Sequence, residues 1–313
     1  MIRFIFSTIC ALFLSVALHA QQDPMFTHYM HNTLSVNPAY AGTREALTIT
    51  ALHRNQWVGF DGAPKTYTLT MHAPVFTENI GLGLSLINDE IGPLNTTSIF
   101  ADFAYHIQMN KEHNKLTFGL KGGVNLMRGN LSSLNLDDNQ YDPAFSSDIE
   151  SKFLPNFGFG VYYLANKWYF GLSSPRLLTN DFLNDLVYGS STIFSDQRHY
   201  FFIMGTMIDL THNIKLNPST MLKGTKGTPM VLDLSAIFIF DEKFEIGLMH
   251  RTGDAFGALL GYNISDQIRL GYSYDWSTTN QSIRYNGGSH EVIIRYDFIF
   301  RERGRRIVSP RYF

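Results

Sequence analysis

The sequence predicts an all-β protein: a transmembrane, antiparallel up-and-down β-barrel of about 14 strands, preceded by a cleaved signal peptide. Three observations predict this fold. Apolar and polar residues alternate with a period of two, the alternating segments are even in number, and their connections alternate between short and long. With 44% hydrophobic and 17% charged residues, the 313-residue chain does not have the composition of a disordered protein.

Residues 80–86 illustrate the alternation, with an isoleucine and three leucines on one face and two glycines and a serine on the other. In a soluble sandwich the polar face meets bulk water, whereas in a membrane barrel the apolar face meets lipid and the polar face lines the lumen. Small residues crowd the polar faces beside single charges, which favours a crowded lumen. The expected strands are residues 46–56, 64–74, 80–87, 95–109, 114–128, 153–164, 167–174, 196–210, 214–223, 228–240, 243–252, 255–264, 267–275 and 289–300.

The connections between these segments give an independent argument for a barrel. Every second connection is short, and the remaining ones include the three long stretches 129–152, 175–195 and 276–288. Short turns at one end and long loops at the other are typical of outer-membrane barrels. We therefore expect the long loops outside the cell and both chain ends in the periplasm.

The first twenty residues read as a secretory signal peptide. Arg3 is followed by an uncharged, mostly apolar run that ends at Leu18, and Ala20 is a small residue at the expected cleavage site. A retained N-terminal anchor is the alternative. Because the only cysteine is Cys10, the processed chain would hold no disulfide and no thiol nucleophile. The expected organisation is a signal peptide (1–20), a periplasmic or plug segment (21–44), the barrel (45–300) and a basic periplasmic tail (301–313).

Several classes of function find no support in the sequence. The net charge of −2 argues against nucleic-acid binding, which needs a basic surface. His28 and His31 have a spacing that could suit a metal, but only Asp23 lies nearby, so we expect neither a metal nor a cofactor. His53 and His250 are the candidates for a Ser–His lipid hydrolase, a remote alternative, and neither lies near a Gly-x-Ser-x-Gly motif. We expect no enzymatic activity.

Charged residues on the polar strand faces are expected to lie in the lumen, where opposite charges can pair. Such pairing would fill the lumen, although porin-type selectivity is the alternative. The expected lumen charges are Arg54, Lys121, Glu245, Arg251, Arg269, Asp275, Glu291, Arg295 and Asp297.

The two ends of the predicted barrel carry opposite charge. The tail 301–313 has a net charge of +4, and the connection 129–152 has a net charge of −4. Such runs are often only solvated. The functional interpretation is that the tail, with Arg303, Arg305 and Arg306, contacts a periplasmic partner, and that Asp137 and Asp138 face a partner outside the cell. A tail that serves barrel insertion is the alternative.

Short motifs along the chain resemble those of the PorP/SprF family. The N-terminal motifs are Gln21-Gln22-Asp23-Pro24, then Tyr29 and Asn32, then Asn37-Pro38-Ala39-Tyr40-Ala41-Gly42. The later motifs are Arg54-Asn55-Gln56-Trp57, Asp61-Gly62-Ala63-Pro64-Lys65-Thr66, Asp89-Glu90-Ile91-Gly92-Pro93, Ser173-Ser174-Pro175 and Gly288-Ser289-His290-Glu291. Each match is weak alone, but together they run in the family's order from residue 21 to about 297.

This resemblance implies an outer-membrane barrel of the type IX secretion system of Bacteroidota. It implies a role in the secretion or cell-surface attachment of cargo proteins, which in some members is an adhesin for gliding motility. The implied partners are the lipid bilayer, periplasmic ring components, and a secreted cargo C-terminal domain or surface adhesin. No enzymatic activity is implied. The motifs suggest that specificity resides partly in the residues Asn37, Pro38, Tyr40, Gln56, Trp57 and Asp61. A diffusion porin or small-solute channel is the alternative function, because the same barrel supports it.

Overall fold

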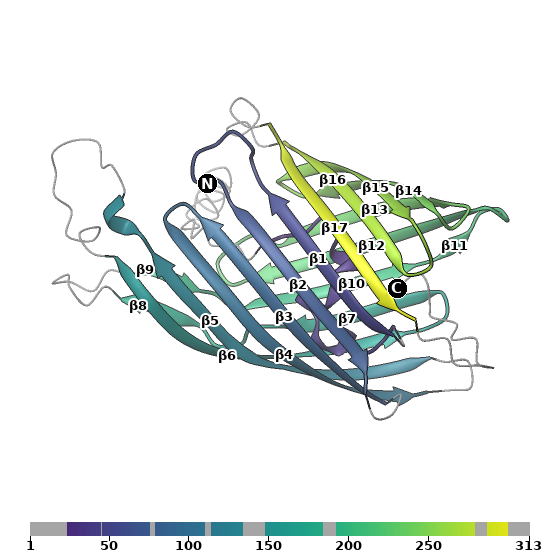
Figure 1. The fold of residues 1–313 in the computed structure, drawn as a ribbon, viewed down its shortest axis with the longest axis horizontal. Helices are drawn as coiled ribbons and strands as arrows, with labels where there is room; N and C mark the ends of the chain where they lie inside the picture. Colours follow the sequence, from purple (N-terminus) through teal and green to yellow (C-terminus); the bar gives the residue numbers. More distant parts are fainter. Residues whose placement is uncertain are drawn as a thin grey trace, which may run out of the picture.

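The computed structural model describes residues 24–44, 46–75, 79–109, 114–133, 148–183, 192–278 and 287–299. Fifteen strands form one antiparallel sheet that closes on itself (Figure 1). β10 and β11 follow each other along one side of β12, separated only by Met207, so the wall consists of fourteen strands. The expected fourteen-stranded antiparallel barrel is confirmed.

The wall consists of β1 (Leu47–Asn55), β2 (Lys65–Pro74), β3 (Ile80–Ile91), β4 (Leu94–Gln108), β5 (Lys115–Gly129), β6 (Ile149–Leu164), β7 (Trp168–Ser174), β10 (His199–Thr206), β11 (Ile208–Asp209), β12 (Ile214–Thr225), β13 (Val231–Phe240), β14 (Phe244–Arg251), β15 (Ala255–Asn263), β16 (Ile268–Ser277) and β17 (Ser289–Phe298). The 3₁₀ helices are η1 (Tyr29–His31), η2 (Thr33–Ser35), η3 (Pro38–Tyr40) and η4 (Leu131–Ser133). A separate hairpin of β8 (Asn180–Leu183) and β9 (Thr192–Asp196) lies where the sequence indicates only a long connection.

The first and last strands close the barrel. β1 pairs with β17 over its whole length, from Leu47 opposite Phe298 to Asn55 opposite His290. The connections segregate as expected: the turns after β2, β4, β6, β11, β13 and β15 are short, and the connections after β1, β5, β7 and β16 lie at the opposite end. We call these the short-turn end and the long-loop end.

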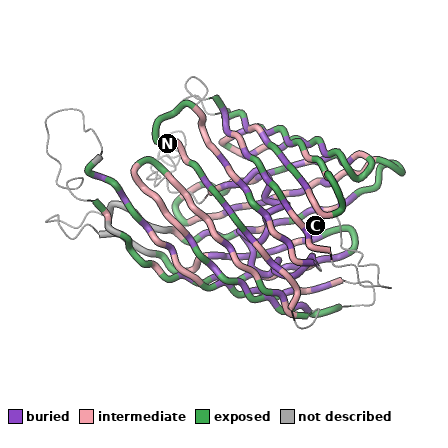
Figure 2. The backbone as a smooth tube through the Cα atoms, viewed as in Figure 1, coloured by how far each residue is buried: buried purple, intermediate pink, exposed green. Residues whose placement is uncertain are grey.

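Alternating burial along the strands shows which face points inward (Figure 2). On β14, Glu245 and Arg251 are buried, whereas Phe244, Ile246 and Leu248 at the alternate positions are 55%, 53% and 70% exposed. Because large apolar side chains stay exposed while charged ones are buried, the solvent for the outer face is hydrocarbon rather than water. This distribution of apolar and charged side chains is the inverse of that in a soluble protein.

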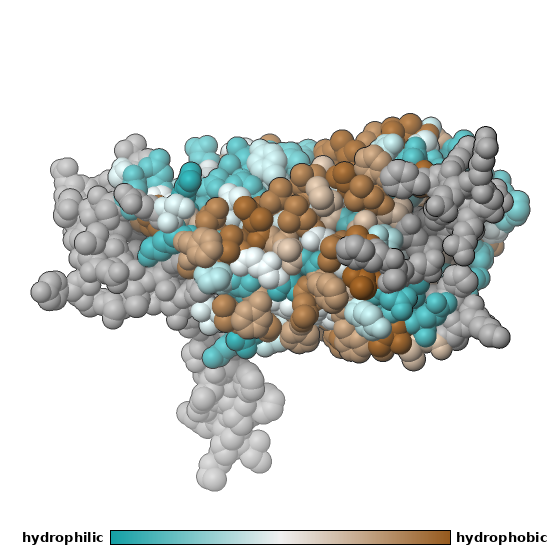
Figure 3. All heavy atoms as spheres, turned by 60° about the horizontal axis from the view of Figure 1, so that its bottom comes forward, coloured by the Kyte–Doolittle hydropathy of each residue, from teal (hydrophilic) through white to brown (hydrophobic). Residues whose placement is uncertain are grey.

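Exposed apolar side chains form a belt around the outside of the wall. Hydrophobic residues cover much of the face shown in Figure 3, between hydrophilic residues nearer the two ends. Trp276 at the long-loop end and Trp168 at the short-turn end are both exposed, as amphipathic rings at two membrane interfaces would be. Among the described residues, no helix has the length and apolarity needed to cross a membrane.

Residues 24–44, which we call the lumen segment, run inside the barrel rather than along its wall (Figure 1). Every residue of this segment except Pro24 is buried. The expected signal peptide, the acidic residues Asp137 and Asp138, and the basic tail with Arg303, Arg305 and Arg306 lie outside the described residues.

Candidate functional site

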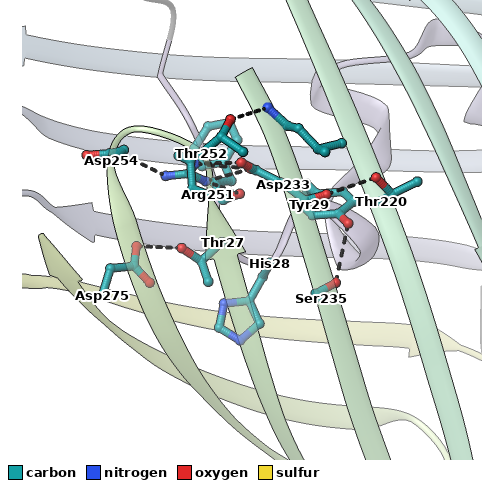
Figure 4. A network of polar contacts seen from close by, with 12 residues as sticks. Thr27, His28, Tyr29, Thr220, Asp233, Ser235, Arg251, Thr252, Asp254 and Asp275 are labelled. Carbon is teal, nitrogen blue, oxygen red and sulfur yellow. Dashed lines mark hydrogen bonds and ion pairs between the residues drawn. The ribbon is translucent and has the colours of Figure 1, made fainter. Parts of the chain in front are cut away.

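The lumen segment is fixed at the long-loop end by two carboxylates of the wall. Glu291, which is fully buried on β17, accepts the backbone N–H groups of Thr27 and His28 at 2.9 and 2.7 Å. The hydroxyl of Thr27 donates to Asp275 on β16 at 2.6 Å, and Figure 4 shows these two side chains pointing toward each other. The described part of the segment therefore begins at the long-loop end, not at the periplasmic end expected for the chain terminus.

Buried arginines hold these acidic groups in place. A guanidinium nitrogen of Arg54 on β1 lies 2.7 Å from Asp275 and 3.2 Å from Glu291. Arg251 on β14 forms a two-point pair with Asp233 on β13, with both N–O distances at 2.9 Å, and it also contacts the backbone carbonyl of Phe26 at 3.4 Å. Both arginines are at most 2% exposed, so these charge-assisted bonds are shielded from water and geometrically specific.

A second cluster holds the segment at the short-turn end. Arg44 donates to Asp297 near the end of β17 at 3.1 Å. The ring of His31 lies with its Nε2 2.6 Å from a guanidinium nitrogen of Arg269, which is ion-paired with Glu245. Burial, and then the positive charge of Arg269, hold the pKa of His31 well below its usual range. The ring is therefore neutral and accepts the hydrogen bond from Arg269.

Glycines on the inner wall let the lumen segment approach the strand backbones. A Cβ added at Gly119 on β5 would overlap the backbone of Ala39, and one added at Gly81 on β3 would overlap the carbonyl of Ala41. Asn37 donates to the carbonyl of Val161 at 3.1 Å, and its own side chain caps η3 by accepting from the N–H of Ala39. Some of the small residues that indicated a crowded lumen, such as Gly81 and Gly119, are therefore contact positions for this segment.

The first long-loop connection packs against the start of β17. The N–H of Trp57 donates to the hydroxyl of Ser289 at 3.2 Å, and the N–H of Val58 donates to the carbonyl of Gly288 at 2.9 Å. Trp57 has a positive φ of 46°, a conformation held by these two contacts. Motifs separated by more than two hundred residues in the sequence therefore meet at one rim.

The same rim includes the turn between β3 and β4. The N–H of Gly92 donates to the carbonyl of Gly62 at 2.9 Å, and both residues have positive φ angles, which glycine adopts without strain. Thr66 donates to Asp89 at 2.6 Å just below this contact. Asp61 is exposed beside it. We call residues 56–64, 92–93 and 287–289 the rim cluster.

A cavity of about 440 Å³, including its open mouth, borders the beginning of the lumen segment. Pro24 and Phe26 form one side, and Phe100, Lys121 and Phe201 belong to the opposing walls. The ammonium of Lys121 lies 5.5 Å from the ring centre of Phe100 and is ion-paired elsewhere with Asp102. Apolar rings and the ion-paired Lys121 therefore border this opening.

The residues expected to bind partners fall into three groups. Asn37, Pro38 and Tyr40 are buried in the lumen segment, where the contacts described for them are internal to the chain. Gln56 and Trp57 are half-buried in the rim cluster. Asp61 in the same cluster is exposed; the remaining expected residues lie outside the described part of the chain.

All nine charges expected in the lumen are buried on inward-facing positions of the wall. The sequence analysis missed Asp102 and Asp233, which pair with Lys121 and Arg251. Alternation alone could have found them, because each carboxylate stands between two outward-facing neighbours on its strand. It also missed the partners contributed by the lumen segment, His28 and Arg44 among them.

Neither the metal nor the hydrolase alternative gains support from the geometry. Within the described ranges, no group of three His, Cys, Asp or Glu side chains is arranged to hold a metal ion. The rings of His53 and His250 stack on Tyr67 and Phe256, and the Nδ1 atom of each has no hydrogen-bond partner among the described residues. A Ser–His hydrolase needs the histidine bonded to the nucleophile and to an orienting group.

Three solved structures are similar to this chain at low sequence identity. Among solved structures, the CymD monoaromatic hydrocarbon channel is 13% identical and has a TM-score of 0.52, covering 87% of this chain and 93% of its own. The Acinetobacter baumannii outer membrane protein Omp33 is 10% identical with a TM-score of 0.45, covering 83% of this chain and 100% of its own. A Pseudomonas aeruginosa FadL homologue is 12% identical with a TM-score of 0.47, covering 84% and 93%.

The likeness to CymD concerns the fold alone. No curated protein matches the chain. The family model described as type IX secretion system membrane protein PorP/SprF matches residues 18–296, nearly the whole chain. The protein is therefore an outer-membrane β-barrel that belongs to the PorP/SprF family of type IX secretion system membrane proteins.

Proposed function

We propose that this barrel is a non-enzymatic component of type IX protein secretion that binds the periplasmic secretion scaffold, exported cargo, or both. The observation that carries the proposal is the family match over residues 18–296. Under this proposal the long-loop end faces outward and the short-turn end faces the periplasm, as in other outer-membrane barrels.

The position of three family-motif residues supports recognition at the long-loop end of the barrel. Gln56, Trp57 and Asp61 lie in the rim cluster, held by backbone contacts to residues 287–289. Rigid loops on a rigid scaffold are typical places for binding residues. We propose that this rim, with Asp137 and Asp138 of the acidic connection 129–152, contacts exported cargo or a surface adhesin.

We propose that the basic tail serves the other end of the barrel. The last described strand, β17, runs toward the short-turn end and closes against the beginning of β1. Arg303, Arg305 and Arg306 follow it in the sequence and would attract an acidic surface of a periplasmic ring component. Truncation after residue 300 should leave a folded barrel that loses a co-purifying partner. Loss of barrel assembly would instead show that the tail acts in the insertion of the barrel into the membrane.

The test of the proposal is a deletion strain of the native host, complemented by variants. Deletion should trap particular secreted proteins inside the cell or release them to the medium. A variant with Gln56, Trp57 and Asp61 changed to alanine should reproduce that defect, whereas the matched control Lys226→Ala, in an exposed loop at the same end, should restore display. Unchanged surface display in the deletion strain would contradict the proposal.

A diffusion channel is the second candidate, favoured by the likeness to CymD, which is described as a monoaromatic hydrocarbon channel. The buried lumen segment weighs against a permanently open pore, because it occupies the space through which a solute would pass. Steady conductance of the purified, unmodified protein in planar bilayers would favour this second candidate over the first.

A further inference from the structure

We propose that the lumen segment, residues 24–44, is a releasable stopper, and that the barrel encloses a channel for hydrated ions and small polar solutes that opens when the segment leaves. Neither the family match nor the secretion function assigns such an activity. Four structural features carry the inference, and each concerns residues of the segment or of the wall that faces it.

The wall is complete without the segment. No residue of the segment pairs with a strand of the sheet, and its only regular elements are three short 3₁₀ helices. The barrel is closed by the β1–β17 ladder, which runs through every residue of β1 from Leu47 to Asn55. The segment is therefore held as a bound peptide is held, and its departure breaks no backbone bond between strands.

The charges of the wall pair with one another and keep those partners after the segment leaves. Arg54 stays paired with Asp275 and Glu291. The further wall pairs are Arg251 with Asp233, Lys121 with Asp102, Arg269 with Glu245 and Arg295 with Asp297. Departure of the segment would therefore leave few buried charges unpaired. An unpaired buried charge is the main electrostatic cost of removing one partner of an ion pair.

One side of the wall is polar and can be wetted. β2 directs Thr66, Thr68, Thr70 and His72 inward, all buried. Thr70 donates to the side chain of Asn32 at 3.1 Å, and His72 accepts the N–H of Gly42 at 3.1 Å. The opposite side, on β13 and β14, presents apolar side chains such as Ile237 to the segment. A polar strip lined by hydroxyl groups can exchange its bonds to the segment for bonds to water, as a fully apolar lining cannot.

The topology sets the direction of release. The segment is tethered to β1 at the short-turn end, where Arg44 pairs with Asp297, and its other end near Thr27 lies at the long-loop end. Withdrawal toward the short-turn end needs no threading past the tether. A partner that binds the segment from the periplasmic side could therefore open the channel.

Two glycines on β5 offer a matched pair of full-length variants. A Cβ at Gly119 would overlap the backbone of Ala39, so the side chain of Gly119→Val would displace the segment from its binding position. A Cβ at Gly122 on the same strand meets nothing within 4 Å, so Gly122→Val adds the same side chain without touching the segment. Valine suits a strand at both positions. Gly81→Val, which opposes Ala41 from β3, provides a second and independent displacement.

The measurement is single-channel conductance of the purified proteins in planar bilayers, with barrel folding checked by heat-modifiable migration in gels. The unmodified protein and Gly122→Val should remain mostly closed. Gly119→Val and Gly81→Val should show at least several-fold more open time. Folded Gly119→Val or Gly81→Val protein that stays closed would overturn the proposal, as would equal conductance in all four proteins. Either result would leave the proposed secretion function standing, because that function is read out by cargo display.

Discussion

Glu291 contacts His28 twice: its carboxylate accepts the backbone N–H at 2.7 Å and lies 2.8 Å from the ring Nδ1. These residues are 263 positions apart in the chain. The carboxylate is fully buried, so it links the last strand of the barrel to the beginning of the lumen segment in an environment where unpaired charge is costly. This contact is the natural place to test what holds the segment.

Replacing Glu291 by glutamine should loosen the segment while the barrel still folds. Glutamine keeps the shape but loses the charge that strengthens the bonds to Thr27, His28 and Arg54. A hydrogen bond to a charged group contributes about 1.5–3 kcal/mol, and we expect a loss of about that size in the free energy of unfolding. Hydrogen exchange of residues 24–32 should increase.

Glu242→Gln is the matched control for this change. Glu242 forms a partly exposed ion pair with Lys215 at 2.9 Å, and exposed pairs contribute at most about 1 kcal/mol. Its variant should leave the exchange of the lumen segment unchanged. Equal effects of both substitutions would show that Glu291 acts only through overall charge.

Arg251→Lys should destabilise the barrel far more than its conservative chemistry suggests. The two-point pair with Asp233 uses the fork of the guanidinium, which an ammonium cannot reproduce. Disrupting a buried pair costs about 3–5 kcal/mol, and this substitution should approach that range. Urea-induced unfolding in detergent measures it. Lys167→Ala breaks the exposed pair with Asp209 and should change the same midpoint very little.

The sequence predicts the strands of the wall well because the alternation that identifies each strand lies within that strand. The expected strand 243–252 corresponds to β14 (Phe244–Arg251), and the faces of Glu245 and Leu248 follow from a period of two. The β8–β9 hairpin escapes this reasoning because a four-residue strand such as Asn180–Leu183 is too short to show a period.

The lumen contacts could not be predicted, because they depend on where a segment without periodicity settles. Asn37 and Tyr40 belong to a turn-rich stretch, and their sequence does not specify whether they meet a partner or the chain's own wall. Their position is set by distant residues such as Gly160 and Tyr162. A glycine on a strand indicates a close approach of another group, but it does not identify that group.

Leu248→Arg should destabilise the barrel by placing charge in the apolar belt. Leu248 is 70% exposed at the middle of β14, with Ile246 beside it. Arginine on the lipid face near the bilayer midplane costs about 2–4 kcal/mol. Folding into lipid vesicles in urea gives the free energy. Asp266→Arg, in a short turn, is the control and should fold like the unmodified protein. Equal folding of both variants would contradict a lipid-facing β14.

Acidification should loosen the lumen segment through His31. The pKa of this ring is lowered well below the ordinary value of 6.5, first by burial and then by Arg269. The other groups that face it are Arg295, Arg44 and His28, with Glu245 at 3.9 Å from its Nε2. Three of its charged neighbours are arginines, so a proton on the ring is strongly disfavoured while the segment is docked.

The sign follows from comparing the docked and released states. The released ring binds a proton below pH 6.5 and the docked ring does not, so His31 leaves docking unaffected above that pH and weakens it as the pH falls. One proton corresponds to about 1.4 kcal/mol per pH unit. Protease access to residues 24–44 should therefore rise between pH 7.5 and pH 5. His31→Gln keeps an acceptor for Arg269 but cannot bind the proton, so its pH dependence should be shallower. If protease access depended on pH in the same way in both proteins, a group other than His31 would be responsible for the pH dependence.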